Sequence, residues 1–186
     1  EKADLQPKSW YFWRRTFSSL KYRDFRLVWL GSCTEHMGEQ METMAIAWLM
    51  MELTRSPFYL GMLTLCRIAP LFFFALLGGV VADHFRKLRL LFATQAALMV
   101  LALVLGVLVE AKVVQIWMLC ALVFLSGTAM AFDIPVRQAF IVDLVGKPDL
   151  PNAIALNSTI FNGARIMGPA LAGILIGVIG TAADNL

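Results

Sequence analysis

The 186-residue chain is 59% hydrophobic and only 16% charged, with a formal net charge of +3. Soluble domains carry about 25% charged residues, so this composition excludes a soluble enzyme domain, a disordered protein and a secreted disulfide scaffold. The small, scattered excess of positive charge gives no reason to expect nucleic acid as a partner. The composition predicts an integral membrane protein that is surrounded by lipid, with an all-α transmembrane helical bundle as its fold.

The first 27 residues form a predicted cytoplasmic tail that holds seven basic side chains. Its segment 10–15 mixes aromatic and basic residues, and both kinds find partners in the lipid headgroup layer. The tail therefore has two equally supported interpretations, an interfacial segment and a fully solvated one.

The transmembrane domain is expected over residues 28–186. A helix needs about 20 residues to cross the hydrocarbon core, and five apolar segments reach that length: 28–53, 57–82, 90–109, 113–135 and 155–180. Their connections are short except for residues 137–152, a predicted loop that contains Pro148 and Pro151. Asp149 followed by Pro151 is typical of a helix start, because proline fits the first turn.

Basic residues are distributed unequally between the two ends of these spans. Twelve of the sixteen lysines and arginines lie in the tail and in the connections after the second and fourth spans. The opposite connections hold only Arg55 and Lys112. Because basic connections stay cytoplasmic, the N-terminus is predicted to be cytoplasmic.

A short internal repeat relates the second and fifth spans. Residues 67–70 and 165–169 both run from arginine–isoleucine to proline, and glycines follow each of them. The two spans would cross in opposite directions, as inverted repeats of three helices do. The repeat predicts five helices of a six-helix unit, whose sixth helix is not in this sequence.

Three carboxylates interrupt the first predicted span. Glu35, Glu39 and Glu42 are spaced i, i+4 and i+7, which places them on one stripe of the helix. An acid at the helix centre costs about 2.5–3.5 kcal/mol, so a lipid-facing stripe of three would cost about 8–10 kcal/mol. We expect the stripe to line a proton and substrate cavity, together with the intramembrane Arg67 and Arg165. The alternative is a static ion-pair network.

The depth of each charged residue in the membrane indicates which of them binds protons and which of them pair. Glu39 lies near the middle of its span and is the strongest candidate for proton coupling. At 1.5 Å per residue, Glu42 lies about 21 Å and Arg67 about 22 Å from the cytoplasmic ends of their helices. These two residues are predicted to pair, with Glu39 or a residue outside this sequence as the alternative partner of Arg67.

The connection between the second and third spans carries a candidate gating motif. Gly79 precedes Asp83 by one helical turn, and Arg86 and Lys87 follow. A small residue at this spacing lets another helix approach the carboxylate closely. Asp133, near the cytoplasmic end of the fourth span, is a plausible second acid for these cations. A plain topology signal is the alternative interpretation of the turn.

The fifth span carries a candidate helix-packing motif of Gly163, Gly168, Pro169 and Gly173. Small residues in such rows let helix backbones approach closely within a membrane. No spacing typical of metal ligands or of a nucleophile–histidine pair occurs in the sequence, so neither a metal, a cofactor nor enzymatic activity is expected.

From about residue 25 to 180, the sequence resembles the major facilitator superfamily of secondary transporters. Residues 79–87 resemble its signature of glycine, three residues, aspartate and a basic cluster, and residues 163–173 resemble the glycine–proline motif of its exporters. Residues 132–139 and 150–153 are similar to the bacterial branch that contains enterobactin exporters and macrolide efflux proteins.

This resemblance implies a protein of twelve helices in two six-helix halves, of which this chain would supply helices one to five of the N-terminal half. It implies proton-coupled export of a small amphipathic molecule, such as a drug or a siderophore, across the plasma (inner) membrane. The partners would be the small-molecule substrate, protons and the C-terminal half. The alternative is a non-transporting structural or channel-forming membrane subunit.

Overall fold

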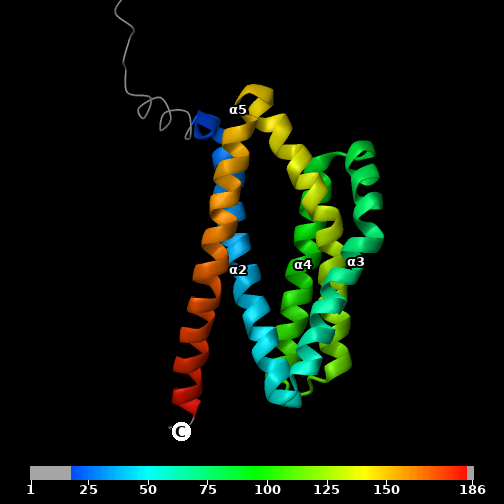
Figure 1. Cartoon of the computed structure of the whole chain (residues 1–186), viewed down its shortest axis with the longest axis vertical. Coiled ribbons are helices and arrows are strands. Elements are labelled where there is room, and N and C mark those ends of the chain that lie inside the picture. Colours follow the sequence, from blue (N-terminus) through cyan, green and yellow to red (C-terminus); the bar gives the residue numbers. More distant parts are fainter. Residues whose placement is uncertain (1–17, 184–186) are drawn as a thin grey trace, which may run out of the picture. The chain divides into compact units, whose positions relative to one another are not determined.

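The computed structural model describes residues 18–183, and every regular element in that range is helical. The elements in chain order are η1 (Ser18–Lys21), α2 (Arg23–Thr54), α3 (Pro57–His84), α4 (Lys87–Glu110) and α5 (Ile116–Ala183) (Figure 1). The all-α prediction is therefore confirmed. Residues 1–17 of the tail lie outside the described part of the chain, so both interpretations of the tail stay predictions.

The described helices have the length and the surface of membrane spans. Four segments are long and apolar enough to cross a bilayer: Pro57–Val81, Lys87–Glu110, Ile116–Gly146 and Pro148–Val178. The 32-residue α2 is longer but less apolar, because Glu35, Glu39 and Glu42 lie in it. Large apolar side chains face outward from α3, with Phe72 82% and Leu76 84% exposed. Lipid solvates such side chains, whereas each would be costly in water.

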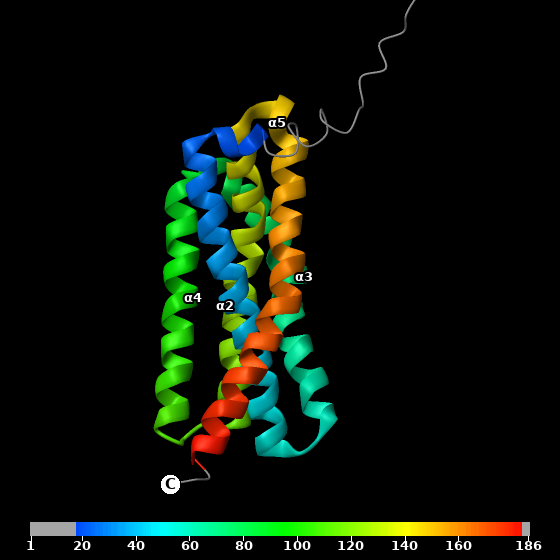
Figure 2. The same cartoon turned by 90° about the vertical axis from the view of Figure 1, so that its left-hand side faces the viewer.

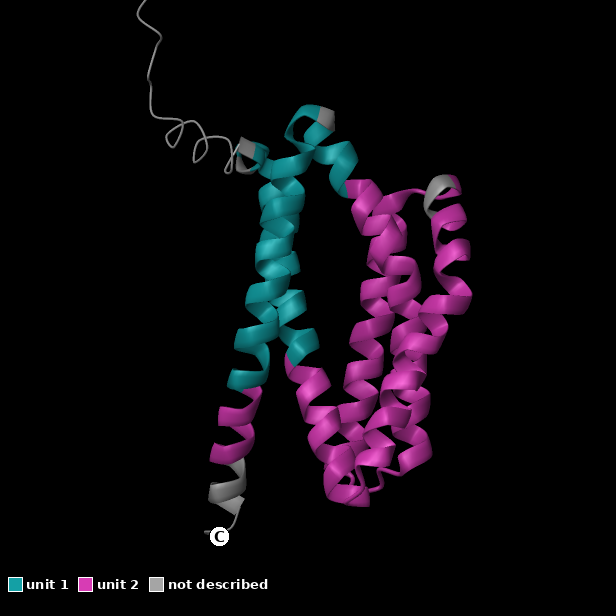
Figure 3. Ribbon diagram, viewed as in Figure 1, with its two compact units in different colours: residues 1–40, 141–171 teal, residues 41–140, 172–186 magenta. Residues whose placement is uncertain are grey.

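The chain divides into two compact units, and each unit combines segments that are distant in sequence (Figure 3). Unit 1 comprises residues 1–40 and 141–171, and unit 2 comprises residues 41–140 and 172–186. The core of unit 2 is a cluster of aliphatic side chains from α2, α3 and α5: Ile46, Met50, Leu63, Leu119 and Val123.

In unit 2, α3 and α5 approach each other at two glycines. A Cβ atom at Gly78 would collide with the carbonyl oxygen of Ala131 and would lie 3.2 Å from Cγ of Pro135. A Cβ atom at Gly127 would collide with the carbonyl oxygen of Arg67. The two helix backbones therefore touch, as small residues permit in membrane bundles.

In unit 1, the start of α2 packs on two stretches of α5 (Figure 2). Phe25 is 1% exposed and contacts a cluster formed by Ile141, Val145, Ala153 and Leu156. Because Phe25 already belongs to the helix, α2 begins five residues before the predicted span.

The predicted loop over residues 137–152 is wrong, because this stretch is helical on both sides of Gly146. The fourth span continues past Pro135 to Gly146, and the fifth begins at Pro148. Ile141 and Val145 are one turn apart, so a helical backbone lets both reach the apolar cluster of unit 1. Gly146 has φ +69°, a conformation that glycine adopts readily. One residue therefore makes the joint that a loop was expected to make.

The segment before α2 is tied to the start of the fifth span. Oγ of the fully buried Ser19 donates to the carbonyl oxygen of Asp149 at 3.0 Å, and the Tyr22 hydroxyl donates to Oδ2 of the same residue at 3.1 Å. This hydrogen bond, together with the negative charge of Asp149, raises the pKa of Tyr22 above its ordinary value of 10.0. These two hydrogen bonds hold the residues just before α2 close to the start of the fifth span, next to Gly146.

Candidate functional site

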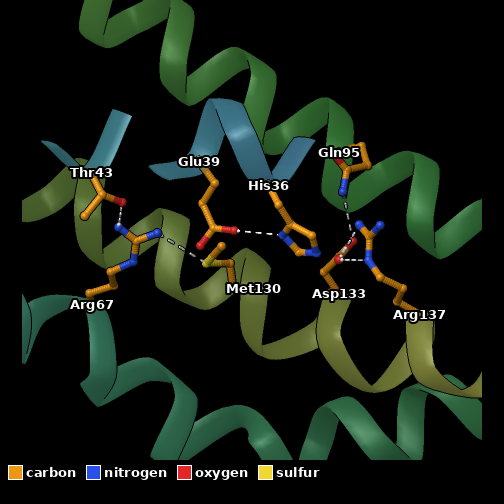
Figure 4. Close-up of polar contacts among 8 residues, drawn as sticks. All are labelled: His36, Glu39, Thr43, Arg67, Gln95, Met130, Asp133 and Arg137. Carbon is orange, nitrogen blue, oxygen red and sulfur yellow. Dashed lines mark hydrogen bonds and ion pairs between the residues drawn. The ribbon is translucent and has the colours of Figure 1, made fainter. Parts of the chain in front are cut away.

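Arg67 lies on α3, and its guanidinium reaches two other helices of unit 2. Nη1 donates to Oγ1 of Thr43 on α2 at 2.6 Å, and Nη2 lies 3.8 Å from Sδ of Met130 on α5 (Figure 4). Glu42, the predicted partner, is half-buried and directly precedes Thr43. The Glu42–Arg67 pair itself stays a prediction. Arg67 thus connects three helices of unit 2 through polar contacts.

Asp133 forms the most extensive polar network among the described side chains of unit 2. It is 5% exposed, and its Oδ1 accepts hydrogen bonds from Thr94 Oγ1 at 2.6 Å and from Gln95 Nε2 at 3.2 Å. Its Oδ2 accepts from Nε and Nη2 of Arg137 at 3.0 and 2.8 Å (Figure 4). Both carboxylate oxygens therefore accept hydrogen bonds: the ion pair with Arg137 lies within α5, and the bonds from Thr94 and Gln95 connect α4 with α5.

Thr94, Gln95 and Arg137 were missed by sequence reasoning, although two signals could have found them. Asp133 and Arg137 are opposite charges at i, i+4, which face the same side of a helix. Thr94 and Gln95 are the only uncharged polar residues in the sequence of α4. Polar side chains inside membrane spans pair with one another. Hydrogen bonds between the Asp133–Arg137 pair and the two polar residues of α4 could therefore have been expected.

The candidate gating turn is described only in part. Nothing lies within 4 Å of a Cβ atom built at Gly79. The backbone of Asp83 lies in the last turn of α3, but its side chain is outside the described part of the structure. Arg86 is exposed, and Nζ of Lys87 donates to the carbonyl oxygen of Ala139 on α5 at 3.4 Å. The gating role of this motif stays a prediction.

The first two glutamates of the acidic stripe lie in unit 1, where both are half-buried. Oε2 of Glu39 accepts a hydrogen bond from Nδ1 of His36 at 3.3 Å (Figure 4). On α5, the Arg165 guanidinium lies 5.8 Å from the ring centroid of Phe161, and this ring contacts His36 edge-to-face at 5.6 Å. Unit 1 thus brings the acid, the imidazole, an aromatic ring and the guanidinium into one row. Glu35 directly precedes His36 on α2.

The four residues of the predicted helix-packing motif have different surroundings. Gly168 is buried, and a Cβ atom there would collide with Cβ of Gln40 and lie 3.4 Å from the Met37 carbonyl oxygen. Nothing lies within 4 Å of such an atom at Gly163 or Gly173. Close approach of α2 and α5 within unit 1 therefore depends on Gly168. Pro169, the next residue, is half-buried.

Among the side chains that the structure describes, no three histidine, cysteine or carboxylate groups gather as a metal site would require. Cys33, Cys66 and Cys120 are free thiols, half-buried in the helices.

Comparison with known families identifies the type of protein in which this polar interior lies. Residues 14–185 match the model of a major facilitator family described as "Transmembrane secretion effector". The chain belongs to this transporter family. With four helices apolar enough to cross a bilayer among the described residues, it is a multi-pass membrane chain of the major facilitator superfamily, whose members are transporters and not enzymes. The resemblance seen in the sequence is confirmed.

Two relatives illustrate the range of the family. The staphyloferrin A transporter of Staphylococcus aureus is 29% identical over 143 residues, which are 76% of this chain and 36% of the relative. Macrolide efflux protein A of Streptococcus pyogenes is 23% identical over 162 residues, which are 85% of this chain and 40% of the relative. The chain thus spans about two fifths or less of these relatives. No solved structure matches the chain.

Proposed function

We propose that this chain supplies the first five helices of a proton-coupled exporter of small amphipathic molecules, such as drugs or siderophores. A sixth helix and a second half complete the transporter. The concentration of basic residues at one end of the spans supports a cytoplasmic N-terminus. Residence in the plasma (inner) membrane is proposed from the family alone.

The observation that carries this proposal is a set of charged side chains inside helices whose outer surface is apolar. Asp133 is nearly fully buried, and Glu39 and His36 have side chains only 19% and 14% exposed. Charged residues within membrane spans are expensive and mark ion or substrate pathways. Asp133 has its charge balanced by Arg137 and serves to connect helices. Glu39 belongs to the acidic stripe and is the proposed proton site.

The chemical class of the substrate follows from the charges that face the pathway. The three glutamates favour a cationic or, when protonated, a neutral amphipathic molecule. Arg67 and Arg165 favour an anionic one. Relatives named for macrolide efflux and for staphyloferrin A transport support a drug or a siderophore as the transported molecule.

Transport by the complete protein in liposomes tests this proposal. A radiolabelled macrolide is supplied outside vesicles whose lumen is acidic, and its accumulation is followed together with proton release from the lumen. We expect accumulation that collapses with the pH gradient, and a Glu39→Gln variant that loses the pH dependence and still binds the macrolide. Macrolide movement that is independent of the gradient, or a plain ionic conductance, would support the channel-forming alternative instead.

A further inference from the structure

His36 was not among the residues predicted to line the proton and substrate cavity, but it contacts Glu39, which was. The two residues are separated by three positions on α2, and their side chains are 14% and 19% exposed. Nδ1 of His36 lies 3.3 Å from Oε2 of Glu39. An ionised carboxylate only accepts hydrogen bonds, so Nδ1 carries a hydrogen atom and donates it to Glu39. The other ring nitrogen, Nε2, is then the basic atom of the neutral imidazole.

Charged and aromatic groups of α2 and α5 lie near this pair in unit 1. On α2 the adjacent charged residue is Glu35. On α5 the Phe161 ring faces His36 edge-to-face at an interplanar angle of 86°, and the Arg165 guanidinium lies 5.8 Å from the Phe161 ring centroid. An aromatic ring thus packs against both the imidazole and the arginine. The nearest opposite charge to His36 is the carboxylate that it already contacts.

We propose that His36 and Glu39 bind the transported proton as one unit, with the proton on Nε2 of the imidazole and the carboxylate as its counter-charge. This inference rests on the proposed proton-coupled function. The empty unit carries a net charge of −1, as neutral imidazole beside carboxylate. One proton from water converts it to an imidazolium–carboxylate pair of net charge zero. Release to the other side returns the proton to water, and no other bond changes.

Imidazole is a stronger base than a carboxylate, so the shared proton favours Nε2 of His36 over the carboxylate of Glu39. Transfer of an unpaired charge out of water is expensive, whereas a hydrogen-bonded pair of opposite charges compensates that cost. The loaded unit is therefore the form better suited to a dry pathway, and the empty unit needs water or a cationic substrate beside it.

Infrared difference spectra of the purified complete transporter, recorded between alkaline and acid pH, test the location of the proton. We expect wild type to show an imidazole protonation signal in this difference spectrum, and His36→Gln to lose it. His84→Gln is the matched control, because His84 is the only other histidine of the chain and bonds the Val80 carbonyl oxygen on its own helix. It should leave that step unchanged. His36→Asn repeats the test if the glutamine variant folds poorly.

The pH profile of macrolide transport gives a second readout that a merely structural histidine would not move. Free imidazole and free carboxyl groups titrate about two pH units apart. His36→Gln leaves only carboxylates of the acidic stripe to bind the proton, so the midpoint should shift toward acid by on the order of 1–2 pH units.

Two results would overturn the inference. One is a neutral-pH carboxyl signal in wild type that Glu39→Gln removes and His36→Gln leaves intact. The other is a transport midpoint that His36→Gln does not move. If wild type shows no gradient-driven transport, the proposed function fails, whereas the infrared signals still decide which residue of the pair holds the proton.

Discussion

Gly78 and Gly61 offer a quantitative test of the helix packing, because both lie on α3 and differ in what a methyl group would meet. A Cβ atom at Gly78 would collide with the backbone oxygen of Ala131, which cannot rotate away. At Gly61, which is exposed, nothing lies within 4 Å of such an atom. Alanine is favoured over glycine in a helix by about 1 kcal/mol, and both positions gain this equally. The difference in stability between Gly78→Ala and Gly61→Ala therefore measures the cost of the collision alone.

Forcing extra volume into a packed contact costs about 1–3 kcal/mol. We expect Gly78→Ala to be less stable than Gly61→Ala by this amount. At about 2–4 °C per kcal/mol for a chain of this size, Tm should differ by roughly 2–12 °C. Heating the detergent-purified protein and measuring the fraction that stays monodisperse gives this difference. Gly127→Ala, which meets the Arg67 carbonyl oxygen, should behave like Gly78→Ala. Equal Tm values for all three variants would refute direct backbone contact between α3 and α5.

Three further predictions concern polar contacts. Asp133→Asn leaves a buried guanidinium without its counter-charge, which should cost about 3–5 kcal/mol; unchanged thermal stability would contradict the buried ion pair. Glu42→Gln and Arg67→Gln should each impair folding or transport, and exchanging the two charges should restore part of it; a double variant no better than either single one argues against pairing. The pKa of Tyr22 is raised in the folded protein, so its bond to Asp149 contributes stability below pH 10.0 and loses it as pH rises through the folded-state pKa. The absorbance difference between wild type and Tyr22→Phe should therefore show phenolate formation with a midpoint above pH 10.0, and a midpoint at or below pH 10.0 would disprove the contact.

The helical segments of the chain could be predicted because runs of about 20 apolar residues have few other stable structures. The connection between the fourth and fifth helices could not. A loop was expected over residues 137–152, with a helix start at Asp149 and Pro151, whereas the chain is helical before Gly146 and again from Pro148. Pro135 was taken as a helix end and lies inside the helix. Residues 137–146 are helical because Ile141 is buried against Phe25. Phe25 is distant in sequence, so a local sequence pattern cannot reveal this contact.

The candidate site was predictable where a charge stands alone in an apolar run. Arg67 was singled out in this way, and the structure places it at a junction of three helices. Its bond to Thr43 could not be expected from sequence, because threonine is neutral and commonly bonds its own helix. The close contact at Gly78, and not at its neighbour Gly79, depends on how far the helix is rotated about its axis. Neighbouring residues of a helix point about 100° apart, and composition does not specify which of the two faces the other helix.

The Gly146 joint has a practical consequence for experiments on this protein. Proteases cut, and inserted epitopes are tolerated, at exposed loop tips whose backbone is free to change shape. The turn between the fourth and fifth spans offers no such segment, because the chain is helical up to Gly146 and again from Pro148, with buried Val145 and Ala153 on either side. An epitope inserted there to report sidedness would separate the apolar cluster around Phe25, so the loss of signal would reflect misfolding and not topology. The connection between α4 and α5, around Lys112, is the better place for such a tag.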